Sequence, residues 1–362
     1  MSAQIQNPQA VFGEAEKLNQ AGHFKEAAAK YIKLTSNVAF APFANYRLAG
    51  ITNDSGDSLG AKELYYKAFS SKPDICKNIL PPNHPNHSYI FQGKKDEILL
   101  EHCPLCGANG KAHWCYSLIE MGSTHVQKYN PVRVWMRCDG CNHLFAEEFP
   151  EWKLGKNLSA DLKNIPKNAA GMPTKPALFS YYSKILSKLA QLAGGSEFLE
   201  VGFGGCECSL AAREMGFDVF GIEISGTNVV QALRYGLNAE IHDFVEFETN
   251  RKWDIIILGD VIEHVSDPIQ AAEKIHELLK DDGVVWMSTP NFESAFSTVT
   301  GHADPMRREA GHKNYFSRAS LLKLMARVNF VSVNYQISSH YNGSMEIVFV
   351  KEGHARSRNI KL

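Results

Sequence analysis

One stretch of this 362-residue chain decides its fold: Phe198-Leu199-Glu200-Val201-Gly202-Phe203-Gly204-Gly205-Cys206. An apolar run of strand type ends there in glycines, and a helical pattern from Ser209 to Met215 follows. In α/β proteins, a strand, a glycine-rich turn and a helix in this order present backbone N–H groups to a nucleotide. Alone the motif is weak, but it predicts an α/β fold with a doubly wound sheet.

Acidic residues end the apolar runs that come after this turn. Glu223 closes the run from Val219 to Ile222 and lies 19 positions after Gly204. At about this distance a doubly wound fold places the carboxylate that accepts from ribose hydroxyls. Asp243 closes a third short run, and Asp260 follows a fourth. We therefore expect these acids to gather where parallel strands end.

These features resemble the class I S-adenosylmethionine-dependent methyltransferases. The resemblance covers Tyr181 to Glu352 and rests on four motifs: Glu200-Val201-Gly202-Phe203-Gly204, Gly221-Ile222-Glu223-Ile224-Ser225, Asp260-Val261-Ile262-Glu263-His264-Val265-Ser266-Asp267-Pro268 and Ser288-Thr289-Pro290-Asn291. It implies a Rossmann-like, mostly parallel seven-stranded sheet over residues 177–353. An alternating pattern around Asn342-Gly343 is similar to the hairpin with the reversed last strand of that sheet. The resemblance also implies S-adenosylmethionine as the cofactor.

The residues expected to bind this cofactor all follow strands or lie in the glycine turn; they are Glu200, Gly202, Gly204, Glu223, Asp243, Phe244 and Asp260. The glycines allow close backbone approach and positive φ, and Glu200 can reach the amino group. Glu223 can accept both ribose hydroxyls, and Asp243 with Phe244 suits the adenine. The chain departs from the family at Cys206, where a third glycine is usual.

Asp260, Glu263 and His264 are the first candidates for catalysis, and they would share one face of a helix that begins at Asp260. In one mechanism His264 is the general base and the carboxylates orient it. In another, the three bind a divalent cation such as Mg²⁺, as in the ubiquinone-pathway and small-RNA 2′-O-methyltransferases that their acid-x-x-Glu-His pattern resembles. A purely structural role as a helix cap is the third alternative. His312 and Tyr315, in a Gly-His-x-x-Tyr-Phe-Ser stretch similar to the family's, are the second catalytic pair.

Two C-x-x-C pairs, Cys103 with Cys106 and Cys138 with Cys141, contain four of the eight cysteines. Paired thiolates at this spacing predict a tetrahedral structural zinc site within a ribbon-like module at residues 101–152. Four thiolates leave no coordination position for a catalytic water. A zinc module before a methyltransferase core also resembles the sugar C-methyltransferases that act on nucleotide-linked deoxysugars. The alternative is four unrelated buried cysteines.

Residues 1–76 contain two segments that repeat at a spacing of 34: Ala15 and Ala49, Gly22 and Gly56, Ala27 and Ala61, and Tyr31 and Tyr65. This period resembles the tetratricopeptide repeat. Such a short helical array needs a neighbour to bury its faces. It is expected either to dock a protein partner or to serve as a cap that aids folding or homodimerisation.

Composition bounds the remaining expectations. The net charge of −1 gives no reason to expect nucleic acid or a membrane as a partner. No export signal or apolar run of membrane-spanning length is visible, so a cytoplasmic location is expected by default. Residues 77–100 and 153–176, with Pro, Asn and Gly, are expected to be linkers, and 354–362 a tail.

Three functions follow from these observations. The first is methylation of a small molecule, a sugar or polyol, at oxygen or carbon. The second is methylation of a protein or glycoprotein acceptor that the repeats dock. The third is a non-catalytic adaptor with a degenerate methyltransferase core. Glu200, Glu223 and Asp243 favour an enzyme, because a core without cofactor has no use for the set.

Overall fold

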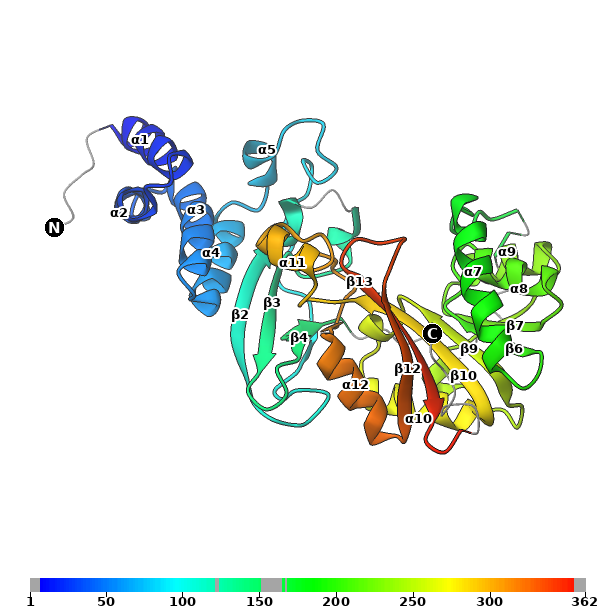
Figure 1. Ribbon diagram of the computed structural model, residues 1–362. Coiled ribbons are helices and arrows are strands. Elements are labelled where there is room, and N and C mark those ends of the chain that lie inside the picture. The colour runs from blue at the N-terminus through cyan, green and yellow to red at the C-terminus, as the bar shows by residue number, and fades with distance from the viewer. Residues whose placement is uncertain (1–6, 121–123, 151–164, 167, 355–362) are drawn as a thin grey trace. The chain divides into compact units, whose positions relative to one another are not determined.

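The structure is a computed structural model, and it describes residues 7–120, 124–150, 165, 166 and 168–354. The chain divides into two compact units, residues 1–151 with 308–311 and residues 152–307 with 312–362. Most of the tail expected at 354–362 and of the linker expected at 153–176 lies outside the described residues. Figure 1 shows the elements of both units.

The first unit begins with four helices: α1 (Pro8–Gln20), α2 (Phe24–Leu34), α3 (Ala41–Asp54) and α4 (Ser58–Ser71). The alanines that recur at a spacing of 34, Ala15 with Ala49 and Ala27 with Ala61, are fully buried. Gly22 and Gly56 have positive φ angles of 80° and 97° in the turns between paired helices. The spacing therefore corresponds to two helical hairpins, and the tetratricopeptide assignment stays a prediction.

The rest of this unit is a small antiparallel sheet with short flanking elements. These are α5 (Cys76–Ile79), β1 (Ile98–Leu99), β2 (Gly110–Ser117), η1 (Leu118–Glu120), η2 (Thr124–Gln127), β3 (Val132–Cys138), β4 (Leu144–Ala146) and β5 (Glu148–Phe149). β3 pairs with β2 and β4, and β1 pairs with β5. Residues 77–100, expected to be a linker, belong to this unit, and Tyr89 and Phe91 are buried there.

The second unit contains a seven-stranded sheet in the order β12-β13-β10-β9-β6-β7-β8. Its strands are β6 (Glu197–Val201), β7 (Asp218–Glu223), β8 (Asn238–Ile241), β9 (Trp253–Gly259), β10 (Leu279–Pro290), β12 (Phe330–Ile337) and β13 (Ser344–Lys351). The five strands from β10 to β8 pair in parallel, whereas β13 is antiparallel to both neighbours. The mostly parallel sheet and its reversed last strand are thereby confirmed.

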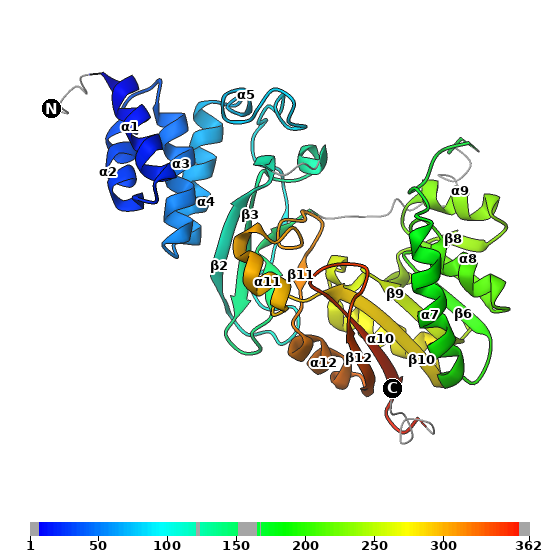
Figure 2. The same ribbon diagram turned by 45° about the horizontal axis from the view of Figure 1, so that its top comes forward.

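The helices of this unit connect the strands: α7 (Ala177–Leu192), α8 (Glu207–Glu214), α9 (Gly226–Arg234), α10 (Pro268–Leu278), α11 (Ala295–Thr300) and α12 (Arg318–Arg327). The short elements are η3 (Phe244–Glu246), η4 (Ile262–His264), η5 (Gly301–Ala303) and β11 (Asn314–Tyr315). Residues of α7, α8 and α9 share one core with Phe198, Ile255 and Trp286 of the sheet. These helices lie together beside β6, as Figure 2 shows.

The order of the strands determines where a ligand can bind. From β6 the chain continues outward to β7 and β8, and it then returns to the other side of β6 to form β9 and β10. In open α/β sheets, ligands bind outside the carboxyl ends of the strands at such a reversal. The glycine turn after β6 lies at this point. No helix among the described residues is long and apolar enough to cross a membrane.

Candidate active site

The glycine turn has the backbone that a close ligand requires. Gly202, Gly204 and Cys206 have φ angles of 70°, 45° and 71°. Cys206 is buried and immediately precedes α8, so it occupies the left-handed conformation that the family's third glycine would adopt. A side chain in this region costs about 1 kcal/mol or more. The departure at Cys206 thus changes the residue and not the shape of the turn.

Glu223 is fixed in place at the end of β7 by three hydrogen bonds. Its carboxylate accepts from the N–H groups of Gly204 at 3.2 Å and Ser225 at 2.9 Å, and from the amide of Asn228 at 3.2 Å. The carboxyl end of β7 is therefore tied to the glycine turn. Asn228 was missed from the sequence, because nothing in its local pattern distinguishes it from an ordinary helical residue.

Glu200, at the end of β6, is 5% exposed and accepts a hydrogen bond from the hydroxyl of Ser209 on α8. Burial raises the pKa of Glu200 to about 8, with a smaller contribution from Glu207. A carboxyl group with this pKa is mostly protonated at neutral pH. A cation bound beside it would favour the ionised form, so this group can couple ligand binding to proton release.

Asp243 and Phe244 follow β8, as expected. The carboxylate of Asp243 accepts from the N–H of Val245 at 3.1 Å, and Phe244 is buried. Ile224, directly after Glu223, is 59% exposed although it is apolar. Because it is exposed directly after Glu223, Ile224 is a candidate contact for the adenine expected there. An apolar residue directly after a strand that ends in an acid could have indicated this contact from the sequence.

Asp260 does not begin a helix, so the expectation of one shared helical face for Asp260, Glu263 and His264 is wrong. Asp260 has a φ of 53°, and η4 is a single turn over Ile262–His264. The Asp260 N–H donates to the carbonyl of Ser288 at 3.1 Å, and its carboxylate accepts from the Ser288 hydroxyl at 3.1 Å. Burial, together with the nearby Glu346 carboxylate, raises the pKa of Asp260 to about 6.

Glu263, His264 and His312 form a compact group instead. Each offers one ligand atom, and these atoms lie within 4.8 Å of one another. The rings of His264 and His312 are 4.8 Å apart between centroids. Glu263 is 1% exposed, and its carboxylate accepts from the hydroxyl of Thr289 at 3.1 Å through one oxygen. The other oxygen, Oε1, is buried without a hydrogen-bond partner among the described residues.

The pKa shifts within this group arise mainly from burial. Burial raises the pKa of Glu263 well above its ordinary value, and Asp260 raises it further. Burial and the neighbouring His264 lower the pKa of His312 well below its usual range. Nδ1 of His312 lies 2.9 Å from the carbonyl of Met306, which as acceptor leaves Nε2 with its lone pair. Metal-binding histidines commonly have this arrangement.

Tyr315, the other member of the second catalytic pair, is held away from such chemistry. It is 1% exposed, and its hydroxyl donates to the buried carboxylate of Asp304 at 2.6 Å. Burial and Asp304 raise the pKa of Tyr315. The structure therefore brings His312 to Glu263 and His264, whereas the hydroxyl of Tyr315 is bound to Asp304, in the segment between η5 and β11.

The segment before α7 contacts the glycine turn. The N–H of Met172 donates to the side-chain oxygen of Asn228 on α9 at 2.8 Å, and its carbonyl accepts from the side-chain amide of Gln231 on the same helix at 2.8 Å. The Thr174 hydroxyl donates to the carbonyl of Gly205 at 2.9 Å. This part of the expected linker is thus bound beside the glycine turn. Its amino-acid composition did not predict this contact.

In the first unit, the four predicted cysteines converge. Their sulfur atoms lie within 4.8 Å of one another, with Cys103 and Cys141 3.6 Å apart and Cys106 and Cys138 3.4 Å apart. The Cys138 sulfur accepts from the N–H of Cys141 at 3.4 Å. None of the eight cysteines is in a disulfide. The donor set and its compactness fit a tetrahedral metal ion.

Comparisons with known proteins agree with the fold. Residues 176–335 match the family model for the methyltransferase domain. The ubiquinone biosynthesis O-methyltransferase of Actinobacillus pleuropneumoniae serotype 7 (strain AP76) is 34% identical over 109 residues, 27% of this chain and 47% of that protein. The corresponding protein of Pasteurella multocida (strain Pm70) is 30% identical over 126 residues, 29% of this chain and 52% of that protein. The chain thus spans about half the length of the curated relatives it matches.

Among solved structures, magnesium protoporphyrin IX methyltransferase from Synechocystis PCC 6803 is 17% identical, with a TM-score of 0.41 over 48% of this chain and 83% of that one. This score is too low to support an inference about function. Residues 176–335 thus match a methyltransferase domain in sequence, and they contribute six of the seven strands of the sheet. The enzyme class expected from the sequence, an S-adenosylmethionine-dependent methyltransferase, is supported by that match and by the curated relatives.

Proposed function

We propose that the protein transfers a methyl group from S-adenosylmethionine to an oxygen nucleophile. The observation that carries this proposal is the set of acidic side chains at the strand ends next to the glycine turn, where the strand order reverses. Glu200, Glu223 and Asp243 end three neighbouring parallel strands there, and Glu223 is hydrogen-bonded to the turn itself. Each part of the cofactor has a suited partner in this set.

Isothermal titration with S-adenosylmethionine tests the proposal. We expect binding by the wild-type protein and at least tenfold weaker binding by Glu223→Gln, since charge-assisted hydrogen bonds contribute about 1.5 to 3 kcal/mol. Asp218→Asn is the matched control, because Asp218 begins the same strand and pairs with Arg251 on the surface. A wild-type protein that binds no cofactor would refute the enzymatic function and favour the adaptor.

An acceptor oxygen bound through a divalent cation is the mechanism that the group at η4 supports best. Glu263, His264 and His312 would hold the ion, and the unpartnered Oε1 of Glu263 is the donor that most needs it. Such an ion polarises a bound hydroxyl and lowers its pKa. Asp260, placed in the set by sequence, lies outside the compact group.

Methyl transfer itself is an in-line displacement in which positioning contributes much of the rate. The acceptor oxygen bonds to the methyl carbon, the carbon–sulfur bond breaks, and its electron pair stays on sulfur. The hydroxyl proton must leave. With His264 bound to the ion, solvent would take the proton from a hydroxyl whose pKa the ion lowers; without an ion, His264, which is exposed beside buried His312, can take it. Manganese titration of wild type and of His312→Ala tests the ion site independently of turnover.

The four cysteines are proposed to bind a structural zinc ion. This ion would join Cys103 and Cys106, which precede β2, to Cys138 and Cys141, at the end of β3. In zinc peptides such sites contribute on the order of 10 kcal/mol to folding. Metal analysis of the purified protein should give one zinc per chain.

The acceptor is proposed to be a small hydroxylated molecule, a sugar or polyol. The candidate metal group Glu263, His264 and His312, together with the similarity to O-methyltransferases, supports methylation at oxygen rather than at carbon. Docking of a protein acceptor by α1–α4, a cytoplasmic location and a homodimer remain predictions from the sequence.

A further inference from the structure

A second acidic residue lies beside Asp260, under the start of α7. Glu346 on β13 is 1% exposed. The hydroxyl of Tyr181 on α7 donates to its Oε1 at 2.6 Å, and the amide of Gln336 on β12 donates to its Oε2. Nothing in the local sequence distinguishes this residue, because it stands in an ordinary alternating strand.

Ser288 on β10 joins the two acids. Its hydroxyl donates to the carboxylate of Asp260 at 3.1 Å, and in the sheet Ser288 is directly opposite Glu346. Opposed residues of antiparallel strands have Cβ atoms about 4.5 to 5.5 Å apart. Two carboxylates are therefore neighbours at the carboxyl edge of the sheet, next to the strand reversal.

The recorded side-chain hydrogen bonds of these acids, in the described part of the chain, come from neutral groups. Lys175 is a nearby cation that lowers the pKa of Asp260, but it is exposed and its Nζ lies 3.5 Å from the hydroxyl of Tyr341. Buried charge is costly unless it is paired. The pair of acids is thus short of positive charge.

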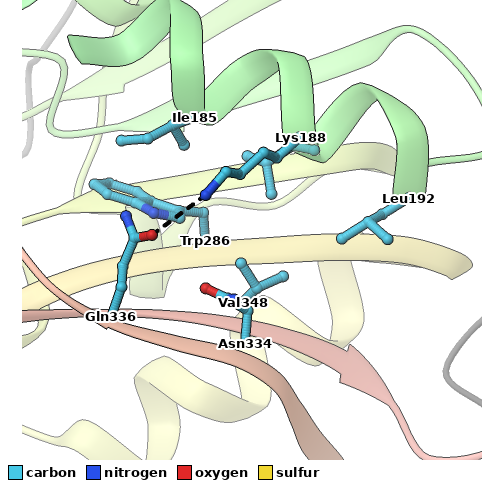
Figure 3. A pocket seen from close by; sticks show the side chains of 8 residues that line it. Ile185, Lys188, Leu192, Trp286, Asn334, Gln336 and Val348 are labelled. Atoms are coloured by element: carbon cyan, nitrogen blue, oxygen red, sulfur yellow. Dashed lines mark hydrogen bonds between the residues drawn. The ribbon is translucent and has the colours of Figure 1, made fainter. Parts of the chain in front are cut away.

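Toward β12 and α7, the surroundings of Glu346 are closed. Gln336 continues the network to Lys188 on α7, whose Nζ donates to its Oε1 at 3.4 Å, as Figure 3 shows. The cavity beside them, about 10 Å³ and lined also by Trp286 and Val348, has room for one water at most. A cation can approach the acids at Asp260, which is partly exposed.

We propose that Asp260 and Glu346 form an acidic subsite that favours the positively charged sulfonium of S-adenosylmethionine over the neutral sulfur of S-adenosylhomocysteine. The inference rests on the proposed function. A sulfonium neither donates nor accepts a conventional hydrogen bond, so a negative field is the direct way to recognise its charge. When the methyl group leaves, the electron pair of the broken bond neutralises sulfur and this attraction ends. The subsite therefore promotes exchange of product for fresh cofactor.

Titration of both cofactor forms into Glu346→Gln tests the subsite. We expect about tenfold weaker binding of S-adenosylmethionine and a change below twofold for S-adenosylhomocysteine, the effect of one unit charge roughly 8 to 12 Å away at an effective dielectric constant of about 20 to 30. Glu352→Gln is the matched control, because it removes the same charge just beyond the far end of β13. It should leave both affinities unchanged.

The outcomes separate this proposal from the function on which it rests. If wild type binds neither form, the proposed function itself fails. If wild type binds both and Glu346→Gln weakens them equally, Glu346 only positions α7 and the subsite is refuted. Unchanged affinity for S-adenosylmethionine also refutes it. Should Glu346→Gln fail to fold, Asp260→Asn provides the same comparison, with the same selective loss expected.

Discussion

Glu200 should make cofactor binding depend steeply on pH. Its pKa of about 8, caused mainly by burial, leaves roughly one tenth of the free protein ionised at pH 7 and one hundredth at pH 6. If the ionised carboxylate receives the cofactor's ammonium group, a proton must leave on binding. Ionisation of Glu200 alone should therefore raise affinity nearly tenfold from pH 6 to pH 7, about 1.4 kcal/mol.

The sign follows from linkage. The pKa of Glu200 is raised in the free protein and falls when a cation binds, so affinity increases with pH until about pH 8. Above that, the α-amino group of the cofactor, with an ordinary pKa of about 7.7 to 8.0, loses its own proton and affinity declines. We therefore expect a maximum near pH 8.

Calorimetric titrations at pH 6, 7 and 8, each in two buffers of different ionisation enthalpy, measure affinity and proton release together. Close to one proton should be released at pH 7. Glu200→Gln should retain at most about a twofold rise, from Asp260 with its pKa of about 6. S-adenosylhomocysteine, which keeps the ammonium, should show the same dependence on Glu200. Flat affinity with no proton release in wild type would refute the role given to this residue.

Variants at three further positions test other parts of the structure. Cys138→Ser should lose the zinc ion and unfold at lower temperature, whereas Cys115→Ser, buried in the same hairpin, should keep one zinc per chain by metal analysis. His312→Ala should weaken manganese binding at least tenfold by calorimetry, and unchanged binding would contradict the ligand group. Cys206→Gly should retain cofactor affinity within about twofold, because glycine accepts the φ of 71°. Cys206→Val should lose about 2 kcal/mol of unfolding free energy in denaturant titration, since a β-branched residue is strained there.

The sheet, and the positions of the residues expected to bind the cofactor, were predictable because the information is local. Each of these local patterns marks the end of one strand. The first is an apolar run that ends in Gly202 and Gly204, and the others are later runs that end in an acid such as Glu223. Parallel strand ends meet at one edge, so the acids gather without any long-range knowledge. The same holds for the cysteines, since two C-x-x-C knuckles need only a hairpin between them to converge.

Catalytic groups that depend on strand-to-strand contacts were not predictable in the same way. The spacing of Asp260, Glu263 and His264 fits a helix, and local pattern favoured that interpretation. The hydrogen bond from the Asp260 N–H to the carbonyl of Ser288 instead accompanies a left-handed residue at the end of β9. The proposed role of Glu346 could not be predicted from the sequence for a related reason, because it depends on the position of Glu346 opposite Ser288 in the sheet.

The ligand group at η4 is completed by a segment almost 50 residues away. The N–H of Lys313 donates to the carbonyl of Glu263 at 2.8 Å, and this bond places the neighbouring His312 beside His264. The proposed mechanism would therefore need the insertion at residues 294–317 as well as the motif at the end of β9. Glu263 supplies the buried unpartnered oxygen, but only the insertion supplies the imidazole whose tautomer the Met306 carbonyl fixes. The motif after β9 thus supplies Glu263 and His264 of the candidate metal site. The third ligand, His312, could be recognised only from the folded structure.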